Sequence, residues 1–242
     1  MQFHHSKLLK KFPNLIAGFT TKDEGNLAFH VEDSELNVMK NHKLLANRLS
    51  YDYMQLVHMK QIHTKDVVKI SSEENFTTPP TCDALITNEK NKPLMVMVAD
   101  CAPILLFDPE CEVIAAVHAG RAGAFANILG ATIERLRKEY GSKPKNILAL
   151  FGPMIGVCCY EVGAEIFSQA QELHLEYAIE KRGGHFFLDI QKILQKQSFE
   201  SGILEKNCEF LNICTSCSTQ SYYSYRAEGK TGRFAGVIMQ KA

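Results

Sequence analysis

The chain has 242 residues, of which 45% are hydrophobic and 22% are charged, a composition typical of a globular protein that can bury a substantial core. The 27 Lys and Arg residues balance 27 Asp and Glu residues, so the formal net charge is zero. This balance argues against a nucleic-acid-binding or membrane-surface protein, because both depend on concentrated basic charge. We therefore expect a small-molecule partner, no nucleic acid, no membrane, and a single domain over residues 1–242.

The N-terminus, the apolar runs and the cysteines all predict a cytoplasmic protein. Residues 1–21 carry charge and histidine, and they lack the apolar core and cleavage pattern of a secretory signal. The longest apolar run, Pro93–Val98, is far shorter than the ~20 residues that span a bilayer. The eight cysteines are irregularly spaced, which is typical of free thiols in a reducing compartment and not of a disulfide scaffold.

The first half of the chain predicts mainly strands. A strand over Phe12–Thr21 is followed by a helix over Asp33–Leu49, which Asp33 or Ser34 would cap. Alternating apolar and polar residues over Met54–Ile70 predict another strand, with His63 on or beside it. Residues 71–82 are polar and contain adjacent prolines, typical of a loop. Short apolar runs then predict strands buried on both faces, over Asp83–Thr87, Leu94–Ala99, Ile104–Asp108 and Val113–Val117.

The second half of the chain adds helices to these strands. The segment His118-Ala-Gly-Arg-Ala-Gly123 predicts a glycine-bearing turn, and a helix over Ala124–Tyr140 follows, closed by Gly141 and Pro144. The later elements predicted are a strand over Ile147–Phe151, helices over Val162–Ala178 and Asp189–Ser201, and strands over Tyr222–Tyr225 and Phe234–Met239. Because strands and helices do not alternate strictly, a mixed α/β sandwich is favoured over a doubly wound fold.

Three side chains with metal-binding chemistry fall where predicted strands end: His63, Cys101 and His118. One thiolate and two imidazoles form a zinc ligand set that leaves a fourth position for water or substrate, as in catalytic zinc sites. Such a metal would activate that water or polarise a substrate oxygen. Two other interpretations stay open: Cys101 as a nucleophile with His118 as its base, or a buried cysteine beside hydrogen-bonded imidazoles.

A series of motifs runs in order along most of the chain and resembles the laccase-domain family. These motifs are Gln61-Ile-His63, Cys82-Asp-Ala-Leu-Ile-Thr87, Val98-Ala-Asp-Cys101-Ala-Pro-Ile-Leu-Leu106, Ala116-Val-His118-Ala-Gly120, Gly152-Pro153, Cys159-Tyr-Glu-Val162, Cys214-Thr215, Tyr223-Ser-Tyr-Arg226 and Thr231-Gly-Arg233. The family was first called multicopper polyphenol oxidase and is now regarded as purine nucleoside phosphorylases with added adenosine deaminase and methylthioadenosine phosphorylase activity. The resemblance implies an α/β fold built as a four-layer α/β/β/α sandwich, like the catalytic domain of cytotoxic necrotizing factor.

The resemblance also implies a site and a reaction. His63, Cys101 and His118 would be both metal ligands and catalytic residues, with zinc as the metal and copper as the alternative. The residues expected to bind substrate or phosphate are Arg121, Arg226, Asn41 and Gln61. The expected reaction is phosphorolysis of adenosine, inosine or methylthioadenosine, with adenosine deamination beside it, in a monomer or homodimer whose partners are a nucleoside and phosphate.

Other functions remain as alternatives at this stage. One is a Cys/His or zinc hydrolase that edits peptidoglycan precursors, since some family members are thought to act on them. Another is a copper-dependent polyphenol oxidase, although the nine scattered histidines are fewer than several coppers would need. The last is a metal-holding interaction module without catalytic activity.

The chain departs from the family pattern at its arginines. Where the family reads His-Ala-Gly-Trp-Arg-Gly, this chain lacks the aromatic residue and carries Arg121 one position earlier. The family's Asn-Arg pair is Asn41-His42 here, and the second arginine after Tyr225 is Ala227. Arginine forks are the natural clamps for phosphate. Arg121, Arg226 and Arg233 remain as candidates, with a surface salt bridge as the alternative, above all for Arg233.

The remaining cysteines and two aspartates have weaker signals. Cys214 and Cys217 have the spacing of a redox motif or half a zinc site, but no second such pair follows, and we expect no function there. The adjacent pair Cys158-Cys159 is expected to pack beside Gly152-Pro153, because adjacent cysteines bridge only with strain. Asp83 and Asp100 are candidates for orienting a metal-bound imidazole, or for capping a turn.

Overall fold

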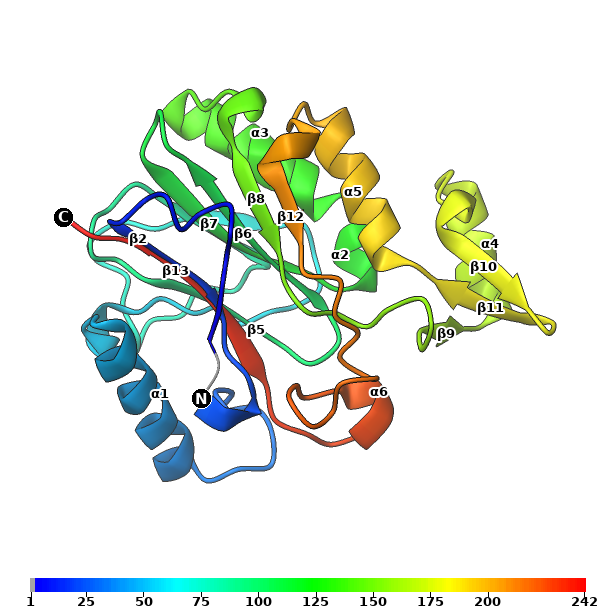
Figure 1. Cartoon of the computed structure of the whole chain (residues 1–242), viewed down its shortest axis with the longest axis horizontal. Coiled ribbons are helices and arrows are strands. Elements are labelled where there is room, and N and C mark those ends of the chain that lie inside the picture. The colour runs from blue at the N-terminus through cyan, green and yellow to red at the C-terminus, as the bar shows by residue number, and fades with distance from the viewer. Residues whose placement is uncertain (1–2) are drawn as a thin grey trace.

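Two facing sheets form the body of the protein in the computed structural model, which describes residues 3–242 (Figure 1). Met1 and Gln2, part of the predicted single domain, lie outside the described residues. The large sheet has the order β12-β8-β6-β7-β4-β3 and is antiparallel except at its two edge pairs. Its strands are β3 (Val67–Lys69), β4 (Ala84–Thr87), β6 (Ala102–Asp108), β7 (Val113–Ala119), β8 (Leu148–Phe151) and β12 (Cys208–Phe210).

The second sheet is antiparallel throughout and has the order β1-β2-β13-β5. Its strands are β1 (His4–His5), β2 (Leu15–Phe19), β5 (Leu94–Val98) and β13 (Phe234–Gln240). The last strand of the chain therefore lies between β2 and β5, and segments from both ends and the middle of the sequence share one sheet (Figure 1).

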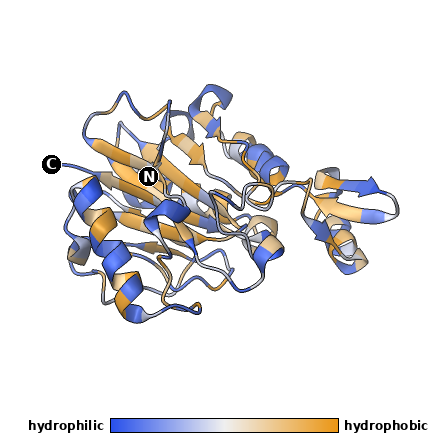
Figure 2. Ribbon diagram, turned by 60° about the horizontal axis from the view of Figure 1, so that its bottom comes forward, coloured by the Kyte–Doolittle hydropathy of each residue, from blue (hydrophilic) through white to orange (hydrophobic). Residues whose placement is uncertain are grey.

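Apolar clusters fill the space between the sheets and on their outer faces. One cluster lies between the sheets, a second between the large sheet and the helices α3 (Ile128–Tyr140) and α5 (Ile190–Glu200), and a third between the second sheet and α1 (Glu35–Leu49). Along β6, Ile104 joins the cluster under the helices while Leu105 joins the cluster between the sheets, as strand alternation requires. Both faces of the strands are thus covered, and Figure 2 shows them as the most hydrophobic part of the ribbon.

The predicted helix in the first half of the chain is present as α1. Its N-cap is Ser34, one of the two residues expected there, whose hydroxyl accepts a hydrogen bond from the Asn37 amide at 3.1 Å. Buried residues recur at helical spacing from Val38 to Leu49 and pack on the second sheet. The helix ends at Ser50, whose φ of 57° is left-handed and stops the hydrogen-bond ladder.

The long strand predicted over Met54–Ile70 is wrong. This segment holds a 3-10 turn at Tyr53–Gln55, isolated bridges at Val57 and Lys60, and then only the short strand β3. His63 lies in the loop between them with a left-handed φ of 62°. The alternating pattern failed because a buried carboxylate, described below, takes the amides that a strand would have used.

The helix predicted over Ala124–Tyr140 is two helices, α2 (Arg121–Phe125) and α3. The break is at Asn127, which has a left-handed φ of 59° and whose side chain accepts a hydrogen bond from the Gly130 amide. Asparagine tolerates this conformation and caps the new helix. The predicted turn after β7 is correspondingly shorter, since Gly120 alone precedes α2.

A small lobe projects from the body and was largely missed by the sequence patterns (Figure 1). It contains a sheet of order β10-β11-β9 and the helix α4. Its elements are β9 (Glu161–Val162), α4 (Ala164–Glu172), β10 (Ile179–Arg182) and β11 (His185–Leu188). The helix predicted over Val162–Ala178 is therefore wrong at both ends: Val162 pairs with Phe186 in the lobe sheet, and His174, with a left-handed φ of 56°, ends the helical path before the hairpin.

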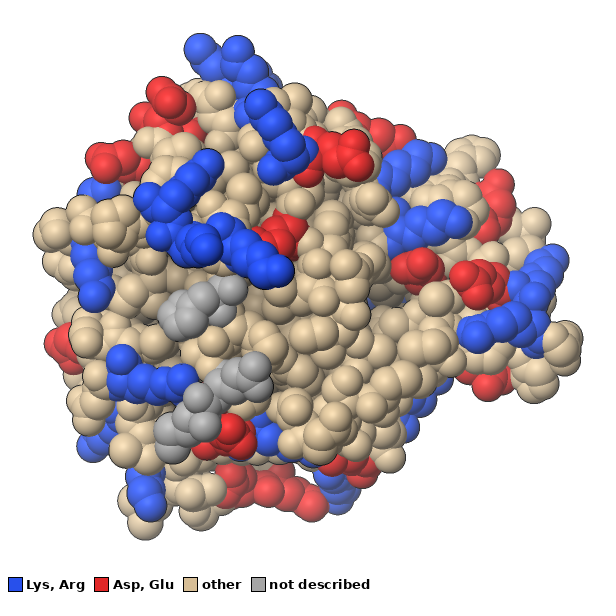
Figure 3. Space-filling model, in the orientation of Figure 1, with Lys and Arg blue, Asp and Glu red and all other residues tan. Residues whose placement is uncertain are grey.

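The strand predicted over Tyr222–Tyr225 is also wrong: α6 (Tyr225–Glu228) begins there, capped by Ser224. The other predicted strands are present within a few residues of their predicted bounds, and the helix predicted over Asp189–Ser201 is α5 with Asp189 as its N-cap. Over residues 3–242, each helix is too short or too polar to cross a lipid bilayer. On the face drawn in Figure 3, basic and acidic side chains are interspersed rather than gathered by sign.

Candidate metal centre

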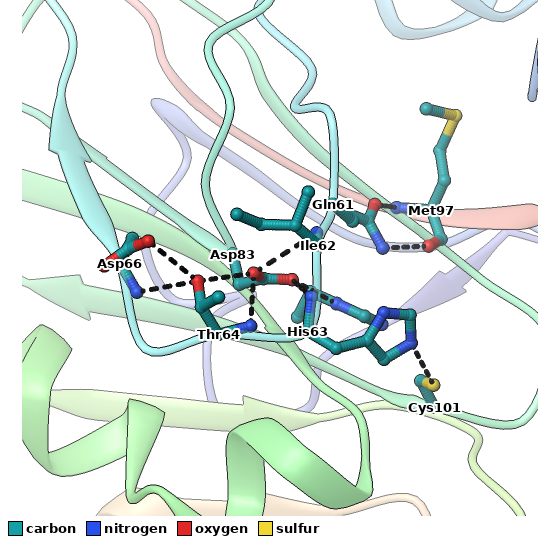
Figure 4. Close-up of polar contacts among 9 residues, drawn as sticks. Gln61, Ile62, His63, Thr64, Asp66, Asp83, Met97 and Cys101 are labelled. Atoms are coloured by element: carbon teal, nitrogen blue, oxygen red, sulfur yellow. Dashed lines mark hydrogen bonds and ion pairs between the residues drawn. The ribbon is translucent and has the colours of Figure 1, made fainter.

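His63, Cys101 and His118 come together at one point, although they lie on separate segments. Their metal-ligating atoms all lie within 4.8 Å of one another. The Cys101 sulfur is 3.9 Å from His63 Nε2 (Figure 4). The imidazole rings of His63 and His118 are edge-on, with centroids 4.8 Å apart. The structure therefore brings together the three side chains that the sequence singled out.

Each of the three is placed by a different local feature. Cys101 lies in the short link between β5 and β6, where the chain passes from the second sheet to the large sheet. His118 lies inside β7, paired with Pro103 of β6, and not in the turn after the strand as predicted. His63 is in the loop before β3.

The carboxylate of Asp83 holds this site in place through hydrogen bonds. Its buried carboxylate accepts hydrogen bonds from the His63 amide at 3.0 Å, from the Thr64 amide at 2.7 Å and from the Thr64 hydroxyl at 3.0 Å (Figure 4). It also accepts the Nδ1 proton of His118 at 2.8 Å. Burial raises the pKa of Asp83, but the hydrogen bonds from His118 and Thr64 lower it more, and the pKa falls to about 2. This carboxylate therefore stays ionised and shapes the loop that carries His63.

The same contact sets the protonation state of His118. Burial lowers its pKa from 6.5, although the hydrogen bond to Asp83 partly opposes this. A neutral imidazole that keeps its proton on Nδ1 leaves Nε2 as the free donor atom, which is the state that metal ligation requires. The orienting contact predicted for either Asp83 or Asp100 is thus made by Asp83.

Asp100 has a different task. Its carboxylate accepts a hydrogen bond from the Thr215 hydroxyl at 2.6 Å and one from the Arg226 amide in the first turn of α6, also at 2.6 Å. Its φ of 89° is unusual for a residue other than glycine. Asp100 therefore holds a distant loop and a helix start against the site, and within residues 3–242 it is not hydrogen-bonded to the imidazole of His63 or His118.

Cys101 is better suited to hold a cation than to act alone. Burial and the neighbouring Asp100 raise the pKa of its thiol to about 12, and Arg233 opposes this only partly. A thiol in this state is a poor nucleophile. The imidazole hydrogen-bonded to the Cys101 sulfur is that of His63, at 3.9 Å, whereas His118 keeps its Nε2 free because its Nδ1 is hydrogen-bonded to Asp83. A bound cation would favour the thiolate.

Gly120 forms the wall of the candidate metal centre. A Cβ atom at this position would lie 2.7 Å from His63 Cδ2 and 3.1 Å from the Cys101 sulfur. The backbone passes this close because residue 120 has no side chain. Two imidazole nitrogens and one sulfur, with a side open to a pocket, fit a tetrahedral transition-metal ion such as zinc with one exchangeable position.

The centre opens into a pocket of about 1000 Å³. Part of its lining is aromatic: the rings of Phe29, His58 and Phe76 contact one another at centroid distances from 5.3 to 6.4 Å. Tyr160 contributes another ring. Sequence reasoning missed Phe29, His58 and Phe76, because they lie in loops without a motif and meet only in the folded chain, and it gave Tyr160 no role although that residue lies in the motif Cys159-Tyr-Glu-Val162.

The pocket lining also includes the candidate arginines. Arg121 begins α2 and donates to the Gln169 side chain at 2.9 Å. Arg226 donates to the backbone oxygens of Cys159 and Glu161 at 3.1 and 2.9 Å. Both arginines thus lie at the pocket with part of their hydrogen-bonding capacity already used.

Arg233 is the arginine most closely coupled to the metal centre. It is half-buried, it lines the pocket, and its charge lowers the pKa of both Cys101 and His118. Its guanidinium donates to the backbone oxygens of Thr231 and Gly232, and within residues 3–242 it has no ion pair with a carboxylate. The salt-bridge alternative for Arg233 is therefore wrong.

Asn41 and Gln61 do not offer free amides to a ligand. The Asn41 side chain donates to the backbone oxygen of Asn26 at 2.9 Å and does not line the pocket. Gln61 lines the pocket, but its amide makes a pair of hydrogen bonds with the Met97 backbone on β5, at 2.8 and 3.0 Å (Figure 4). The Gln61 amide thus pairs with β5 as a residue of a neighbouring strand would, and it fixes the loop that leads to His63.

His42, which replaces the family's arginine, is a buried neutral group. Its ring stacks on Phe29 and its Nε2 donates to the Leu27 backbone oxygen at 2.8 Å. Burial lowers the pKa of His42 to about 4 despite this hydrogen bond, and burial lowers that of His58 to about 4 as well. A guanidinium is therefore replaced by an uncharged ring behind the aromatic wall.

These two histidines predict acid sensitivity. Between pH 6.5 and about 4 the unfolded chain binds protons that folded His42 and His58 do not, so the free energy of unfolding falls as the pH drops through this window. Each pKa unit corresponds to about 1.4 kcal/mol. Urea unfolding at pH 7.5 and 5.0 should show this loss, and it should be smaller in His42→Gln, which cannot titrate. An equal loss in that variant would contradict the assignment.

The protein combines a mixed α/β fold with a His-Cys-His cluster that opens into a pocket lined by arginines and aromatic rings. These features are those of a small-molecule-binding protein with a candidate metal centre. More narrowly, the chain belongs to the family described as multi-copper polyphenol oxidoreductase laccase, whose model matches residues 17–241. The predicted family is thereby confirmed.

Relatives of known name agree with this membership. The chain is 29% identical to purine nucleoside phosphorylase YlmD of Bacillus subtilis over 247 residues, 94% of this chain and 89% of that protein. It is 36% identical to a purine nucleoside phosphorylase of Corynebacterium glutamicum over 217 residues, 88% and 85% of the two chains. The crystal structure of YfiH from Bacillus licheniformis has a TM-score of 0.90 at 28% identity and covers 99% of both chains. That of YlmD from Geobacillus stearothermophilus also has a TM-score of 0.90, at 26% identity, over 96% of this chain and 93% of that chain.

Proposed function

We propose that this protein is a metal-dependent purine nucleoside phosphorylase that converts adenosine or inosine and phosphate into the free base and ribose 1-phosphate. The observation that carries the proposal is the pocket that joins the His-Cys-His cluster, aromatic rings and three arginines. The two relatives that align with most of this chain are named purine nucleoside phosphorylases, which supports the same reaction class. The covered outer faces of the two sheets also favour the α/β/β/α layering implied by the resemblance.

The aromatic part of the pocket suits a purine base. Phe29, His58 and Phe76 offer ring edges and faces to a flat heterocycle, and the methionines Met59 and Met97 extend the apolar lining. Because the pKa of His58 lies at about 4, its imidazole is neutral at physiological pH and does not repel the developing charge of the ribose. A neutral ring can still donate or accept one hydrogen bond with the base.

The arginine part of the pocket suits phosphate. Arg233 brings a guanidinium close to Cys101 and His118, and among the described residues this guanidinium has no carboxylate partner. The Arg226 guanidinium carbon lies 5.3 Å from the centroid of the Tyr160 ring. Guanidinium forks hold phosphate oxygens and stabilise negative charge in a substitution reaction. We assign the main phosphate contact to Arg233, because two arginines of the family pattern are missing from this chain. Arg226 and Arg121 would lie at the rim of the pocket.

Cleavage of the glycosidic bond needs the phosphate and the ribose to be held in line. Asp83 keeps His118 in one tautomer and holds the loop that carries His63. Both imidazoles therefore keep a defined position beside the proposed phosphate site. A metal ion bound by His63, Cys101 and His118 would supply Lewis-acid polarisation of an oxygen of the substrate. Adenosine deamination is a second activity that we assign to the same centre.

The direct test is to incubate the purified, zinc-supplemented protein with inosine or adenosine, with and without phosphate, and to separate the products by chromatography. We expect hypoxanthine or adenine together with ribose 1-phosphate, only when phosphate is present, and no product with Cys101→Ala. Inosine formed from adenosine reports the deaminase activity. Release of neither base would overturn the proposal, and phenol oxidation with added copper, or cleavage of a peptidoglycan precursor, would point to the alternatives.

Arg233→Gln should weaken the use of phosphate more than the binding of nucleoside. Removing the charge of this pocket guanidinium should raise the KM for phosphate and lower kcat/KM for phosphate by about 10- to 100-fold, since a charged hydrogen bond is worth about 1.5–3 kcal/mol. Arg135→Gln, which removes only an exposed ion pair with Glu139 on α3, is the control. Steady-state kinetics with phosphate as the varied substrate measures both. Equal phosphate dependence in the two variants would contradict the assignment.

A further inference from the structure

A second cluster of metal-ligating side chains lies outside the pocket. Cys158 and Cys159, from the loop between β8 and β9, meet Cys214 and Cys217, from the loop between β12 and α6. The four sulfur atoms all lie within 4.8 Å of one another. The sequence patterns missed this because the partner of the Cys214-x-x-Cys217 pair is an adjacent Cys-Cys pair, more than fifty residues earlier in the chain.

The sulfur positions match a metal site and not a disulfide. Cys217 Sγ is 3.3 Å from Cys159 Sγ and 3.6 Å from Cys158 Sγ, whereas a disulfide bond is about 2.05 Å long. Zinc bonded to four sulfurs at about 2.3 Å places them about 3.8 Å apart at the corners of a tetrahedron. The observed separations therefore need only small adjustments to admit an ion at the centre.

The backbone around the cluster is arranged to stabilise a thiolate. The Gly156 amide donates to the Cys214 sulfur at 3.2 Å, and the Cys217 amide donates to the same sulfur. A Cβ at residue 156 would lie 3.2 Å from the Cys158 sulfur, so glycine lets the loop come this close. Amide hydrogen bonds favour the negatively charged sulfur, which is the metal-ligating form.

Backbone pairing holds the two loops together independently of the cysteine side chains. A parallel bridge joins Met154 to Cys214, with the Thr215 amide donating to the Met154 backbone oxygen at 3.1 Å. The four ligands are thus presented by a paired backbone that needs little reorganisation on binding. Such preorganisation lowers the entropic cost of forming a metal site.

We propose that Cys158, Cys159, Cys214 and Cys217 bind a structural zinc ion, separate from the His63-Cys101-His118 centre. Four thiolates are a soft, closed ligand set that leaves no position for substrate, which is the pattern of structural and not catalytic zinc. Cys158 and Cys217 are exposed, so the ion has a route in from solvent.

The position of this site suggests that it clamps one wall of the pocket. Thr215, next to Cys214, donates to the Asp100 carboxylate, and the backbone oxygen of Cys159 accepts from the Arg226 guanidinium. Asp100 in turn precedes Cys101 in the link between β5 and β6. Losing the ion should therefore loosen the Arg226 side of the pocket and lower the thermal stability, while the metal ligands in the pocket stay in place.

Zinc content per chain tests the proposal. The protein is expressed with zinc in the medium, purified without chelators and analysed by inductively coupled plasma mass spectrometry. Cys214→Ser/Cys217→Ser should hold one zinc equivalent less than the parent and unfold at a lower temperature. The matched control, Cys111→Ser/Cys208→Ser, removes two thiols outside both clusters and should keep the parent content. Equal zinc in the parent and the Cys214 variant would overturn the proposal.

A second measurement leaves the four cysteines intact. Cys101→Ala/His118→Ala removes two ligands of the pocket centre, so cobalt(II) added to the reduced protein should produce a thiolate-to-cobalt charge-transfer absorption from the four cysteines alone. Zinc should displace this cobalt. Absence of the absorption would overturn the proposal even if the serine variant failed to fold, and so would an intact mass showing a disulfide between these cysteines in freshly purified, unreduced protein. Neither result depends on nucleoside turnover.

Discussion

Asp83→Asn should remove most of the activity and most of the metal from the pocket centre while leaving the fold in place. Asparagine has the same shape, but one of its two oxygens becomes an amide NH2, which cannot accept the hydrogen bonds that the carboxylate takes from Thr64 or His118. His118 then loses the partner that fixes its tautomer. Loss of such an orienting carboxylate costs about 10- to 100-fold in metal affinity or activity.

The same change should lower the free energy of unfolding by about 1–3 kcal/mol, because donors buried around residue 83 lose an acceptor. Asp66→Asn is the matched control: Asp66 is exposed, also accepts a hydrogen bond from the Thr64 hydroxyl, and does not touch His118. Competition with a chromophoric chelator gives the metal affinity, and urea unfolding gives the stability. A variant with parental metal affinity would show that Asp83 serves the loop and not the centre.

The ionisation of Asp83 also separates its pH effect from that of the histidines. A carboxylate whose folded pKa is lowered from 3.8 to about 2 contributes stability that is complete above pH 3.8 and is lost as the pH falls toward 2. The loss expected from His42 and His58 begins higher, below pH 6.5. Acid unfolding between pH 6.5 and 4 should therefore report the buried histidines and not Asp83.

Gly120→Ala should abolish catalysis without a comparable loss of stability. The backbone at Gly120 has a φ of −71°, which alanine adopts without strain, so the effect comes from contact alone. The new methyl group would lie 2.7 Å from His63 Cδ2 and 3.1 Å from the Cys101 sulfur, and both must move. A displacement of about 1 Å in such a site can cost about 100-fold in rate.

Gly183→Ala provides the control for this variant. Gly183 lies in the lobe hairpin with a left-handed φ of 58°, and a Cβ added there would meet nothing within 4 Å, so alanine strains the backbone without touching the centre. We expect kcat/KM to fall by about 100-fold or more in Gly120→Ala and to be unchanged in Gly183→Ala. Thermal unfolding of both variants checks the fold. Full activity in Gly120→Ala would mean that His63 and Cys101 need not stay in their present positions.

Local patterns in the sequence were enough for most strands of the two main sheets and for α1 with its Ser34 cap, and they singled out the His-Cys-His set, whereas β1 and β12 were not predicted. A strand buried on both faces is a short apolar run, whichever strands it pairs with in the sheet. A helix cap depends only on residues about three positions away. The family motifs added the link among His63, Cys101 and His118, since no spacing along the chain joins these residues. Conversely, the alternating run over Met54–Ile70 suggested a strand because nothing local reveals the carboxylate that bends it.

Contacts between distant segments became visible only in the folded chain. Asp83 and Asp100 both lie within family motifs, yet Asp83 orients His118 and Asp100 holds Thr215 and Arg226. The difference comes from where β4 and the β5–β6 link lie in the sheets. Loop packing likewise places Arg233 at the pocket and brings the four cysteines together. Local patterning along the chain predicts which chemical groups are available and where most of the strands lie, because both depend on neighbouring residues. Which groups meet depends on the register and stacking of two sheets, and no local pattern encodes that.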